Sequence, residues 1–525
     1  MAYYFSWNHR IIGVVAKRRE KSMKEYDVVV IGAGPAGLAA ANKAAANGAS
    51  VLAIDSNLSP GGQLVKQIHK FFGSADICAG TRGIRLADKF YDEARKNGCQ
   101  FMLGASVYAI ERDGEDYMVY AGDGSKTWRI RTKTAVLALG ASENAIAFDG
   151  WTKPGVITAG AAQTLVNQYR VLCGKRVLMV GSGNVGLIVS YQLTQAGIDI
   201  AAIVEAAPAV GGYEVHANKV RRAGIPIYTS TTIVSAEGEG SVTGAVIAKV
   251  DRNFQPIKGT EKRLDVDTIC ISVGLSPLIK LAASCGCELI RNSKRETVPK
   301  LDDCLMTSCP GIFAAGDMAG VEEASIALEE GAIVGNAVSV YLGIAKEEDK
   351  KPEIDEAKAR LEELRARGEK RATRFNAALY ERYSGSKVVV ECGQGIPCNP
   401  CEKYCPAHAI HVGEEITNNP EANLDLCVGC GKCVVACPGM AYFLINMNYS
   451  EVKAEIGMPY EYLPVPLEGS VVRGLDRNGE YVCDAEVTRV QKLKDADSTL
   501  LLKISVPKEY AGVVRAIDRK KVSAE

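Results

Sequence analysis

The sequence predicts an α/β protein that is divided into several domains. Its 525 residues, of which 47% are hydrophobic, exceed the size of a single core. Residues 26–55 and 175–205 each show the order strand, glycine-rich turn, helix and strand, which is typical of α/β domains. In addition, eight of the 17 cysteines fall between Cys392 and Cys437, and this clustering predicts a separate metal-binding unit.

The first glycine-rich turn lies in "VIGAGPAGLAAA" and contains Gly32, Gly34 and Gly37. In this pattern the first glycine permits a tight turn, the second lets a pyrophosphate approach the backbone, and the third lets helix and strand pack closely. Asp55, 18 residues after Gly37, ends the next strand, where a carboxylate can bind ribose hydroxyls. A glycine turn without a ligand is the alternative, but the complete context favours a dinucleotide site.

The second turn, "VGSGNVG", repeats the pattern with Gly181, Gly183 and Gly186. Glu205 follows Gly186 by 19 residues, and the next residues, "AAPAVGGY", contain no arginine. A carboxylate at this place accepts a hydrogen bond from a free 2′-hydroxyl and repels a 2′-phosphate, so we expect NAD(H) rather than NADP(H). Another adenine nucleotide or a vestigial site remains the alternative.

The order of further motifs resembles that of flavoproteins with two dinucleotide-binding domains. "GGQL" (61–64) and "TAVLALGAS" (134–142) precede the second unit, and "GIFAAGDMAG" (311–320) follows it. The resemblance implies FAD in the first domain and a nicotinamide in the second. It adds Gly62, Gly140, Gly316 and Asp317 to the FAD contacts Gly32, Gly34, Gly37 and Asp55, and it assigns the nicotinamide to Gly181, Gly183, Gly186 and Glu205.

In one respect the chain departs from the disulfide reductases of that group. It has no C-x-x-C pair outside the late cysteine cluster, and its one C-x4-C pair there, Cys304 and Cys309, lies far along the chain from both glycine turns, so we expect electrons to leave the flavin by another route. Gln63 and His69 are candidates for residues near the flavin ring by position only, and packing of the loop is the alternative for His69. No catalytic residue is otherwise indicated.

The cysteine cluster contains two related runs. The second run, Cys427-x2-Cys430-x2-Cys433-x3-Cys437-Pro, is the bacterial ferredoxin pattern, in which the fourth cysteine reaches the other cluster. The first run, Cys398-x2-Cys401-x3-Cys405-Pro, has the same ending. Glycine stands at position 395, where the first cysteine of the pattern would lie, so we assign Cys392 as the remaining ligand. The crossover predicts two [4Fe-4S] clusters, one on Cys427, Cys430, Cys433 and Cys405, the other on Cys398, Cys401, Cys437 and Cys392. Paired C-x2-C runs also bind zinc, but the two C-x3-C-P endings favour iron–sulfur clusters.

The predicted fold is α/β, with two Rossmann-like dinucleotide-binding domains, the second inserted in the first, then a ferredoxin-like iron–sulfur domain and a small β tail domain. Between the flavin body and the cysteines, Ile354, Ala357, Leu361 and Leu364 share one face of a charged helix. The expected division is residues 1–24 as an N-terminal arm or an extension before Met23, 25–150 and 276–345 as the FAD domain, 151–275 as the NAD domain, 346–385 as the helical linker, 386–447 as the 2[4Fe-4S] domain and 448–525 as the β domain.

Composition excludes several classes of partner. Lys and Arg number 62, as do Asp and Glu, so the zero net charge gives no indication of nucleic acid or a membrane surface. No segment reaches the ~20 apolar residues of a membrane span. Metal-bound thiolates favour a reducing compartment, so we expect a cytoplasmic protein.

The body also resembles the FAD/NAD-binding α subunits of sarcosine oxidase, proline dehydrogenase, opine oxidase and hydrogen cyanide synthase, through "GGQL" and "GWTKPGVITAGAAQTLVN" (150–167). The resemblance implies a subunit that moves electrons between NAD(H), FAD, [4Fe-4S] clusters and a β-type flavoprotein dehydrogenase subunit or a ferredoxin-like acceptor. We recognise no Ser/His/Asp set, paired catalytic carboxylates or arginine clamp for an organic substrate. The alternatives are a self-contained NADH:ferredoxin-type oxidoreductase and a non-catalytic redox sensor.

Overall fold

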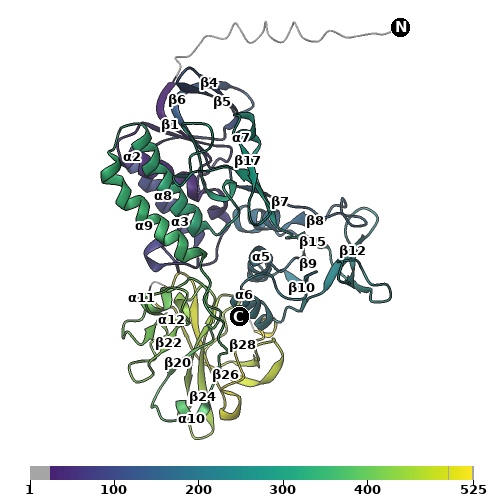
Figure 1. The fold of residues 1–525 in the computed structure, drawn as a ribbon. Helices are drawn as coiled ribbons and strands as arrows, with labels where there is room; N and C mark the ends of the chain where they lie inside the picture. The colour runs from purple at the N-terminus through teal and green to yellow at the C-terminus, as the bar shows by residue number, and fades with distance from the viewer. Residues whose placement is uncertain (1–23, 495, 523–525) are drawn as a thin grey trace.

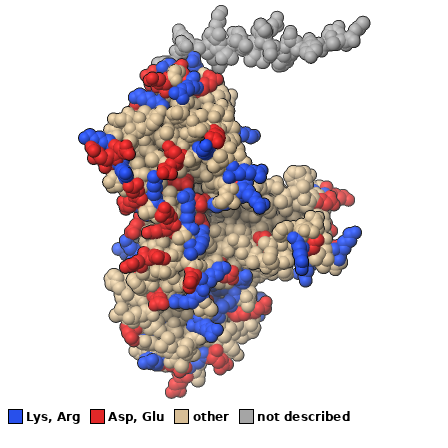
Figure 2. Space-filling model, in the orientation of Figure 1, with Lys and Arg blue, Asp and Glu red and all other residues tan. Residues whose placement is uncertain are grey.

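The computed structural model describes residues 24–494 and 496–522, which form the three lobes visible in Figure 1. The first dinucleotide-binding domain is one lobe, the inserted domain projects to its side, and the iron–sulfur part forms the third with the C-terminal strands. Apart from Lys24, the expected N-terminal arm lies outside the described residues. Positive and negative side chains are interspersed on the face shown in Figure 2, in line with the zero net charge.

The first domain is built on a seven-stranded sheet. Its parallel strands, in spatial order, are β3 (Gln100–Leu103), β2 (Val51–Asp55), β1 (Lys24–Ile31) and β6 (Thr127–Leu137). Strand β6 also pairs with the antiparallel strand β5 (Asp116–Gly122), which in turn pairs with β4 (Ser106–Asp113). A further parallel strand, β19 (Ile312–Ala314), pairs with β6 as well. Helices α2 (Pro35–Ala46) and α3 (Gly83–Lys96) follow the first and second strands.

The inserted domain has a sheet of five parallel strands. In spatial order they are β11 (Ile227–Tyr228), β10 (Asp199–Val204), β9 (Arg176–Val180), β15 (Thr268–Ile271) and β8 (Val156–Thr158). The chief helices are α5 (Asn184–Gln195) and α6 (Glu214–Arg222), and an antiparallel sheet carries β12 (Thr231–Glu237), β13 (Gly244–Lys249) and β14 (Lys262–Leu264). The chain enters through β7 (Ala141–Glu143) and returns through β16 (Leu275–Pro277), and these two strands pair. The predicted insertion of one domain into the other is therefore confirmed.

Two long helices cover the first domain. Helix α8 (Ala324–Tyr341) packs on α2, where a Cβ on Gly331 would collide with the carbonyl oxygen of Ala36. Helix α9 (Glu347–Arg365) packs on α8 and buries the predicted face of Ile354, Ala357, Leu361 and Leu364 against Ile326, Ile333 and Ile416. Because Ile416 belongs to the iron–sulfur part, this helix joins two lobes (Figure 1).

The cysteine cluster is carried on one antiparallel sheet with the C-terminal strands. The strands, in spatial order, are β20 (Lys387–Val390), β23 (Tyr442–Asn446), β24 (Lys453–Tyr460), β27 (Leu500–Pro507), β26 (Tyr481–Gln491), β25 (Val471–Leu475) and β28 (Ala516–Ile517). The expected boundary between residues 447 and 448 falls inside this sheet, because β23 pairs with β24. The cysteines lie between β20 and β23, with the short helices α11 (Pro400–Lys403) and α12 (Lys432–Ala436) and the strand pair β21 (Ile410–His411) and β22 (Glu421–Ala422).

The predicted fold class is confirmed, with two Rossmann-like sheets followed by the iron–sulfur part. Within residues 24–494 and 496–522, none of the helices combines the length and apolar character that a membrane crossing demands.

Candidate dinucleotide and iron–sulfur sites

The first glycine turn leaves a strip of bare backbone at the start of α2. A Cβ on Gly32 would collide with the carbonyl oxygen of Ala138, and a Cβ on Gly37 would collide with that of Gly32, so both positions require glycine. Gly34 and Gly62 face each other, because a Cβ on Gly34 would lie 3.9 Å from the Cα of Gly62. We call this arrangement the first glycine cradle. It fits a pyrophosphate at the N-terminus of α2.

Asp55 ends β2 beside this cradle. Its Oδ2 accepts a hydrogen bond from the backbone N–H of Ala33 (2.7 Å), and its Oδ1 accepts from the backbone N–H of Asn57 (2.8 Å). The carboxylate is buried and is held by the turn itself. Its place at the carboxyl end of the strand is the place from which an acidic residue reaches a ribose.

The remaining predicted FAD contacts border the same edge of the sheet. Gly140, after β6, has a left-handed backbone (φ 73°), and no atom lies within 4 Å of the place that a Cβ would take, so it leaves open space. Gly316 and Asp317 follow β19, and the N–H of Gly316 donates to Oε2 of Glu330 (2.8 Å). Burial raises the pKa of Asp317 to about 6 and that of Glu330 to about 7.

The second glycine turn repeats the geometry at the start of α5. A Cβ on Gly181 would collide with the carbonyl oxygen of Ser272, and a Cβ on Gly186 with that of Gly181. No atom lies within 4 Å of the place that a Cβ on Gly183 would take. Gly211 faces Gly183, because a Cβ on Gly211 would lie 3.8 Å from the Cα of Gly183. This second glycine cradle also has room for a pyrophosphate.

Glu205 takes the place in the second cradle that Asp55 takes in the first. Its Oε2 accepts from the backbone N–H (2.9 Å) and the hydroxyl (2.7 Å) of Ser182, and its Oε1 accepts from the N–H of Ala207 (2.9 Å). The Ser182 hydroxyl also accepts from the N–H of Gly211 (3.1 Å). The carboxylate therefore fixes the turn that borders it.

The second glycine pair of each cradle could have been found in the sequence from its spacing alone. Gly61–Gly62 follows Asp55 by six residues, and Gly211–Gly212 follows Glu205 by the same interval. Both pairs return to the turn that they border, since Gly61 N–H donates to Ala33 (2.7 Å) and Gly212 N–H donates to Ser182 (2.9 Å). The internal repeat is thus longer than its glycine fingerprints.

The two candidates for residues near the flavin ring lie in different surroundings. Gln63 is exposed in the short 3₁₀ helix Gly62–Lys66, next to the first cradle. His69 lies further along, with its Nδ1 3.3 Å from Nε2 of Gln192 on α5. Burial lowers the pKa of His69 to about 3, with Lys219 and Arg82 lowering it further. The structure therefore places His69 at the junction with the inserted domain.

The eight cysteines form two quartets in space. We call Cys405, Cys427, Cys430 and Cys433 the outer quartet, which surrounds a small cavity of about 20 Å³. We call Cys392, Cys398, Cys401 and Cys437 the inner quartet. Burial raises the pKa of the Cys392 thiol to about 12, and the nearby Cys437 and Cys401 raise it further. The structure brings together the residues that the crossover predicts in each quartet.

Each quartet is closed by the same backbone motif. The N–H of Ala409 donates to Sγ of Cys405 (3.2 Å), and the N–H of Ala441 donates to Sγ of Cys437 (3.5 Å). The residues just before these donors, His408 and Met440, both have left-handed backbones, with φ 47° and 51°. The runs "CPAHA" and "CPGMA" therefore fold alike, as the two halves of a repeat.

A loop from the first cradle reaches the inner quartet. Lys70, at 5% exposure, donates to the carbonyl oxygens of Val435 and Ala496 (3.0 Å). Gly73 accepts from the N–H of Asn399 (3.3 Å), and Phe72 packs in one apolar cluster with Cys392, Cys398 and Cys437. We call residues 66–82 the bridging loop, because it joins the flavin side to the cysteines.

The inserted domain touches the same quartet from the other side. Nη2 of the buried Arg222, on α6, donates to the carbonyl oxygen of Met440 (2.9 Å), three residues after Cys437. Lys219, one turn earlier on α6, is also buried, and burial lowers its pKa to about 8. Spacing alone could not identify these cations, because Arg222 and Cys437 are far apart in the sequence.

The described residues contain no set of three His, Cys, Asp or Glu side chains arranged around the position of a single metal ion. In a four-iron cluster each cysteine binds a different iron, so its four ligands need not converge on one point.

A family model for pyridine nucleotide-disulphide oxidoreductases matches residues 26–331. The chain belongs to this family. It is therefore an FAD-dependent oxidoreductase, as the resemblance predicts. A second model, for a 4Fe-4S dicluster domain, matches residues 396–454 and contains seven of the eight predicted cysteines, whereas Cys392 precedes its first residue.

Several similar proteins match more than half of this chain. An opine oxidase subunit of Agrobacterium tumefaciens is 30% identical over 59% of this chain and 65% of its own length. The alpha subunit of sarcosine oxidase of Rhizobium meliloti is 29% identical over 62% of this chain and 31% of its own, so the chain spans about a third of that relative. The structure of L-proline dehydrogenase from P. horikoshii has a TM-score of 0.51 at 22% identity, over 65% of this chain and 61% of that one, and shares the fold.

Proposed function

We propose that this chain is an electron-transferring subunit that connects NAD(H), FAD, two [4Fe-4S] clusters and a partner protein. One observation carries the proposal, namely the order of the sites in space. The bridging loop leads from the first cradle to the inner quartet, the outer quartet follows, and Cys430 of the outer quartet is exposed. Electrons that pass between protein groups need such an unbroken series of closely packed sites.

The two cradles fit the two dinucleotides. The first cradle with Asp55 and Asp317 would hold FAD, and the second with Glu205 would hold NAD(H). When bound, FAD supplies two-electron exchange with a nicotinamide and one-electron exchange with iron–sulfur centres. The chain's own contribution is to fix the turns, through Ala33 and Ser182, and to leave glycine backbone where the phosphates lie.

The quartets are proposed as ligands of two clusters. The closing N–H groups of Ala409 and Ala441 donate to cysteine sulfurs, and such hydrogen bonds help to set cluster potentials. Cys392 completes the inner quartet in our proposal, because its thiol lies close to Cys437 and Cys401.

The outer quartet is the proposed exit to a partner. Val428 and Leu426, beside Cys430, are 69% and 51% exposed. Figure 2 shows few charged side chains over the edge where α11, α12 and β22 lie. The relatives are named as subunits of opine and sarcosine oxidases, so we propose a β-type flavoprotein dehydrogenase subunit of an amine or amino-acid dehydrogenase as partner, with a ferredoxin-like acceptor as the second candidate.

The test uses the purified chain loaded with FAD and clusters. We expect NADH to reduce an artificial dye, and proline and sarcosine to give no reaction without a partner. Oxidation of either amine by the chain alone would overturn its assignment as a subunit. Reduction of ferredoxin by NADH, with no partner subunit co-purifying from the native source, would favour a self-contained NADH:ferredoxin-type oxidoreductase. Absence of dye reduction despite intact clusters would favour a redox sensor.

The nicotinamide preference is tested at Glu205. Glu205→Gln keeps the size of the side chain and an acceptor for Ser182, but removes the charge that repels a 2′-phosphate. One charged hydrogen bond contributes about 1.5–3 kcal/mol, so the ratio of kcat/KM for NADH over NADPH should fall about ten-fold or more. Equal use of both cofactors by the unmutated protein would contradict the assignment.

A further inference from the structure

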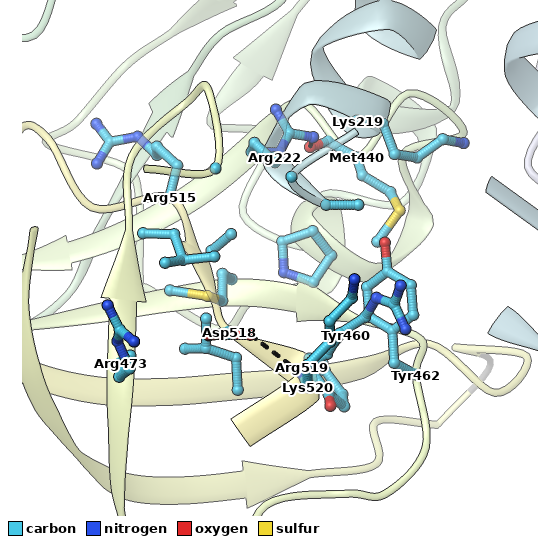
Figure 3. A pocket seen from close by; sticks show the side chains of 18 of the residues that line it. Lys219, Arg222, Met440, Tyr460, Tyr462, Arg473, Arg515, Asp518, Arg519 and Lys520 are labelled. Atoms are coloured by element: carbon cyan, nitrogen blue, oxygen red, sulfur yellow. Dashed lines mark hydrogen bonds between the residues drawn. The ribbon is translucent and has the colours of Figure 1, made fainter. Parts of the chain in front are cut away.

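A second cavity lies away from both glycine cradles, between the inserted domain and the C-terminal strands. It has a volume of about 320 Å³ and is bordered by Tyr191 of α5, the C-terminal end of α6, and residues of β24, β25 and β28 (Figure 3). Residues from the inserted domain, the cysteine run and the C-terminal strands therefore meet around it. A cavity of this size suits a small molecule.

The lining of this cavity is strongly basic. Six cationic side chains border it, but only two acidic ones, Glu480 and Asp518. Figure 3 shows the cations on several sides of the pocket; they are Lys219, Arg222, Arg473, Arg515, Arg519 and Lys520. Since the whole chain carries equal numbers of positive and negative residues, this excess is local.

Most of these cations lack an acidic partner. Arg515 pairs with Glu391 (2.6 Å) and Lys520 with Asp199 (2.6 Å). The other four have no carboxylate oxygen within 4.0 Å among residues 24–494 and 496–522. Of these four, Lys219 and Arg222 are buried, and a buried cation without a carboxylate in contact is costly, because burial removes its water without supplying an adjacent opposite charge.

Two guanidinium groups also keep unused donors. Nη2 of Arg515 and Nε of Arg519 are buried and donate no hydrogen bond within the described part of the chain. Arg515 is only 2% exposed, and Lys219 only 4%. Because both atoms are closed off from solvent, they belong to the packed wall, and a ligand in the cavity would depend on the half-buried residues Arg473 and Arg519 for accessible donors.

Tyrosine rings hold several of the cations in place around the cavity. Lys219 Nζ lies 4.5 Å from the ring centre of Tyr191, and the Arg473 guanidinium lies 4.3 Å from that of Tyr481. These cation–π contacts orient the side chains without neutralising them. The positive charges thus remain available to a ligand.

From the excess of cations, the four that have no carboxylate within 4.0 Å and the volume, we infer that this cavity binds a small multivalent oxyanion, whose phosphate or carboxylate groups contact Arg473, Arg519 and Lys219. No residue of either glycine fingerprint lines the cavity, so the site is separate from those proposed for FAD and NAD(H). A bound oxyanion would touch α6, the "CPGMA" run through Met440, and the C-terminal strands together.

The first experiment is calorimetric titration of pyrophosphate into protein saturated with FAD and NAD⁺, so that both cradles are filled. Arg473→Gln and Arg519→Gln should each weaken binding about ten-fold or more, because each removes a charge from the site. Lys521→Gln, which changes an exposed neighbour outside the lining, should bind as the unmutated protein does. The same affinity in all four proteins, or no saturable binding, would overturn the inference.

Citrate in place of pyrophosphate distinguishes the two sources of negative charge. Tighter binding of pyrophosphate would assign the site to phosphate-bearing ligands, and tighter binding of citrate would assign it to polycarboxylates. Saturable binding of neither would reject the site.

A second measurement needs no substitution. Phenylglyoxal modifies accessible arginines, and pyrophosphate should protect Arg473 and Arg519 by about five-fold or more in rate, as a bound ligand at several times its Kd must. Arg252, exposed on the inserted domain and far from the lining in sequence, serves as the control and should react at an unchanged rate. Equal modification of Arg473 and Arg519 with and without pyrophosphate would overturn the inference.

Discussion

Cys405 and Cys437 close the two cysteine quartets with the same backbone geometry, but the surroundings of the two quartets differ. The inner quartet, which contains Cys437, packs with Phe72 of the bridging loop and with Tyr213 and Val215 of the inserted domain. The outer quartet, which contains Cys405, ends at the surface, where Cys430 is exposed.

This difference shows how one repeated motif acquires two roles. The local fold is set by the short run from cysteine to the N–H donor four residues later, and it is the same in both halves. The role depends on what lies beyond that run. Lys219 and Arg222 near the inner quartet are buried and poorly screened, whereas Lys432, next to Cys433 of the outer quartet, is exposed to water.

Removal of one closing cysteine should produce the largest contrast between the quartets. We expect about eight irons per chain in the unmutated protein and about four in either Cys405→Ala or Cys437→Ala, because each change destroys one [4Fe-4S] cluster. EPR of the reduced proteins should show a different remaining cluster in each variant. Cys483→Ala, at a buried cysteine outside both quartets, is the control and should keep all the iron.

The crossover would be wrong if Cys405→Ala kept the signal of the cluster on Cys427, Cys430 and Cys433. FAD content should be unchanged in every variant, which separates loss of a cluster from loss of the fold.

The second prediction concerns the completeness of the inner quartet. Cys392 lies outside the matched dicluster segment, yet its thiol lies near Cys437 and Cys401. Cys392→Ala should therefore lower the iron content by as much as Cys398→Ala does, to about four per chain. An iron content near eight in Cys392→Ala would show that another group completes the inner cluster.

Much of this arrangement was accessible from the sequence, because the signals are local. The two glycine turns, the helical face of α9 and the spacing of the cysteines each depend on residues within about 20 positions of one another. The dinucleotide folds and the pairing of Cys405 with the later run follow from such patterns. The insertion of one domain in the other followed from the resemblance to flavoproteins with two dinucleotide-binding domains, whose order of motifs the chain shares.

What the sequence did not reveal depends on distant residues. The pairing of β23 with β24 makes one sheet of the cysteine domain and the tail, although the alternation in residues 448–525 looked like a separate unit. The bonds from Lys70 to Val435 and from Arg222 to Met440 join segments more than 200 residues apart. No local sequence pattern indicates these contacts, because which residues meet is determined only when the chain has folded.

A smaller effect is expected at the surface of the outer quartet. Val428→Asp places a charge beside Cys430, at a position that is 69% exposed. The charge should weaken docking of an added ferredoxin by about 1 kcal/mol and therefore slow its NADH-driven reduction about five-fold. Val452→Asp, at 71% exposure on another loop, is the matched control. Iron content and dye reduction should be normal in both variants. Equal rates of ferredoxin reduction in the two variants would place the docking surface elsewhere.

The smallest predicted effect compares the electrostatics of the two quartets. Reduction adds negative charge to a cluster, so a nearby buried cation raises its potential. Lys219→Met removes a buried charge near Cys437 and should lower the midpoint potential of the inner cluster by about 40 mV, which corresponds to about 1 kcal/mol for one electron. Lys432→Met removes an exposed charge next to the outer quartet and should change that potential much less, because water and salt screen it.

The pH dependence gives this prediction a second test. Burial lowers the pKa of Lys219 to about 8, so the group is charged at pH 7 and loses its charge as the pH rises above that value. The midpoint potential of the inner cluster in the unmutated protein should therefore fall between pH 7 and pH 9, whereas that in Lys219→Met should stay nearly constant. EPR-monitored redox titrations at both pH values, without added oxyanion, measure the difference. Parallel curves for the two proteins would show that Lys219 does not act on the inner quartet, and the contrast between the quartets would then rest on exposure alone.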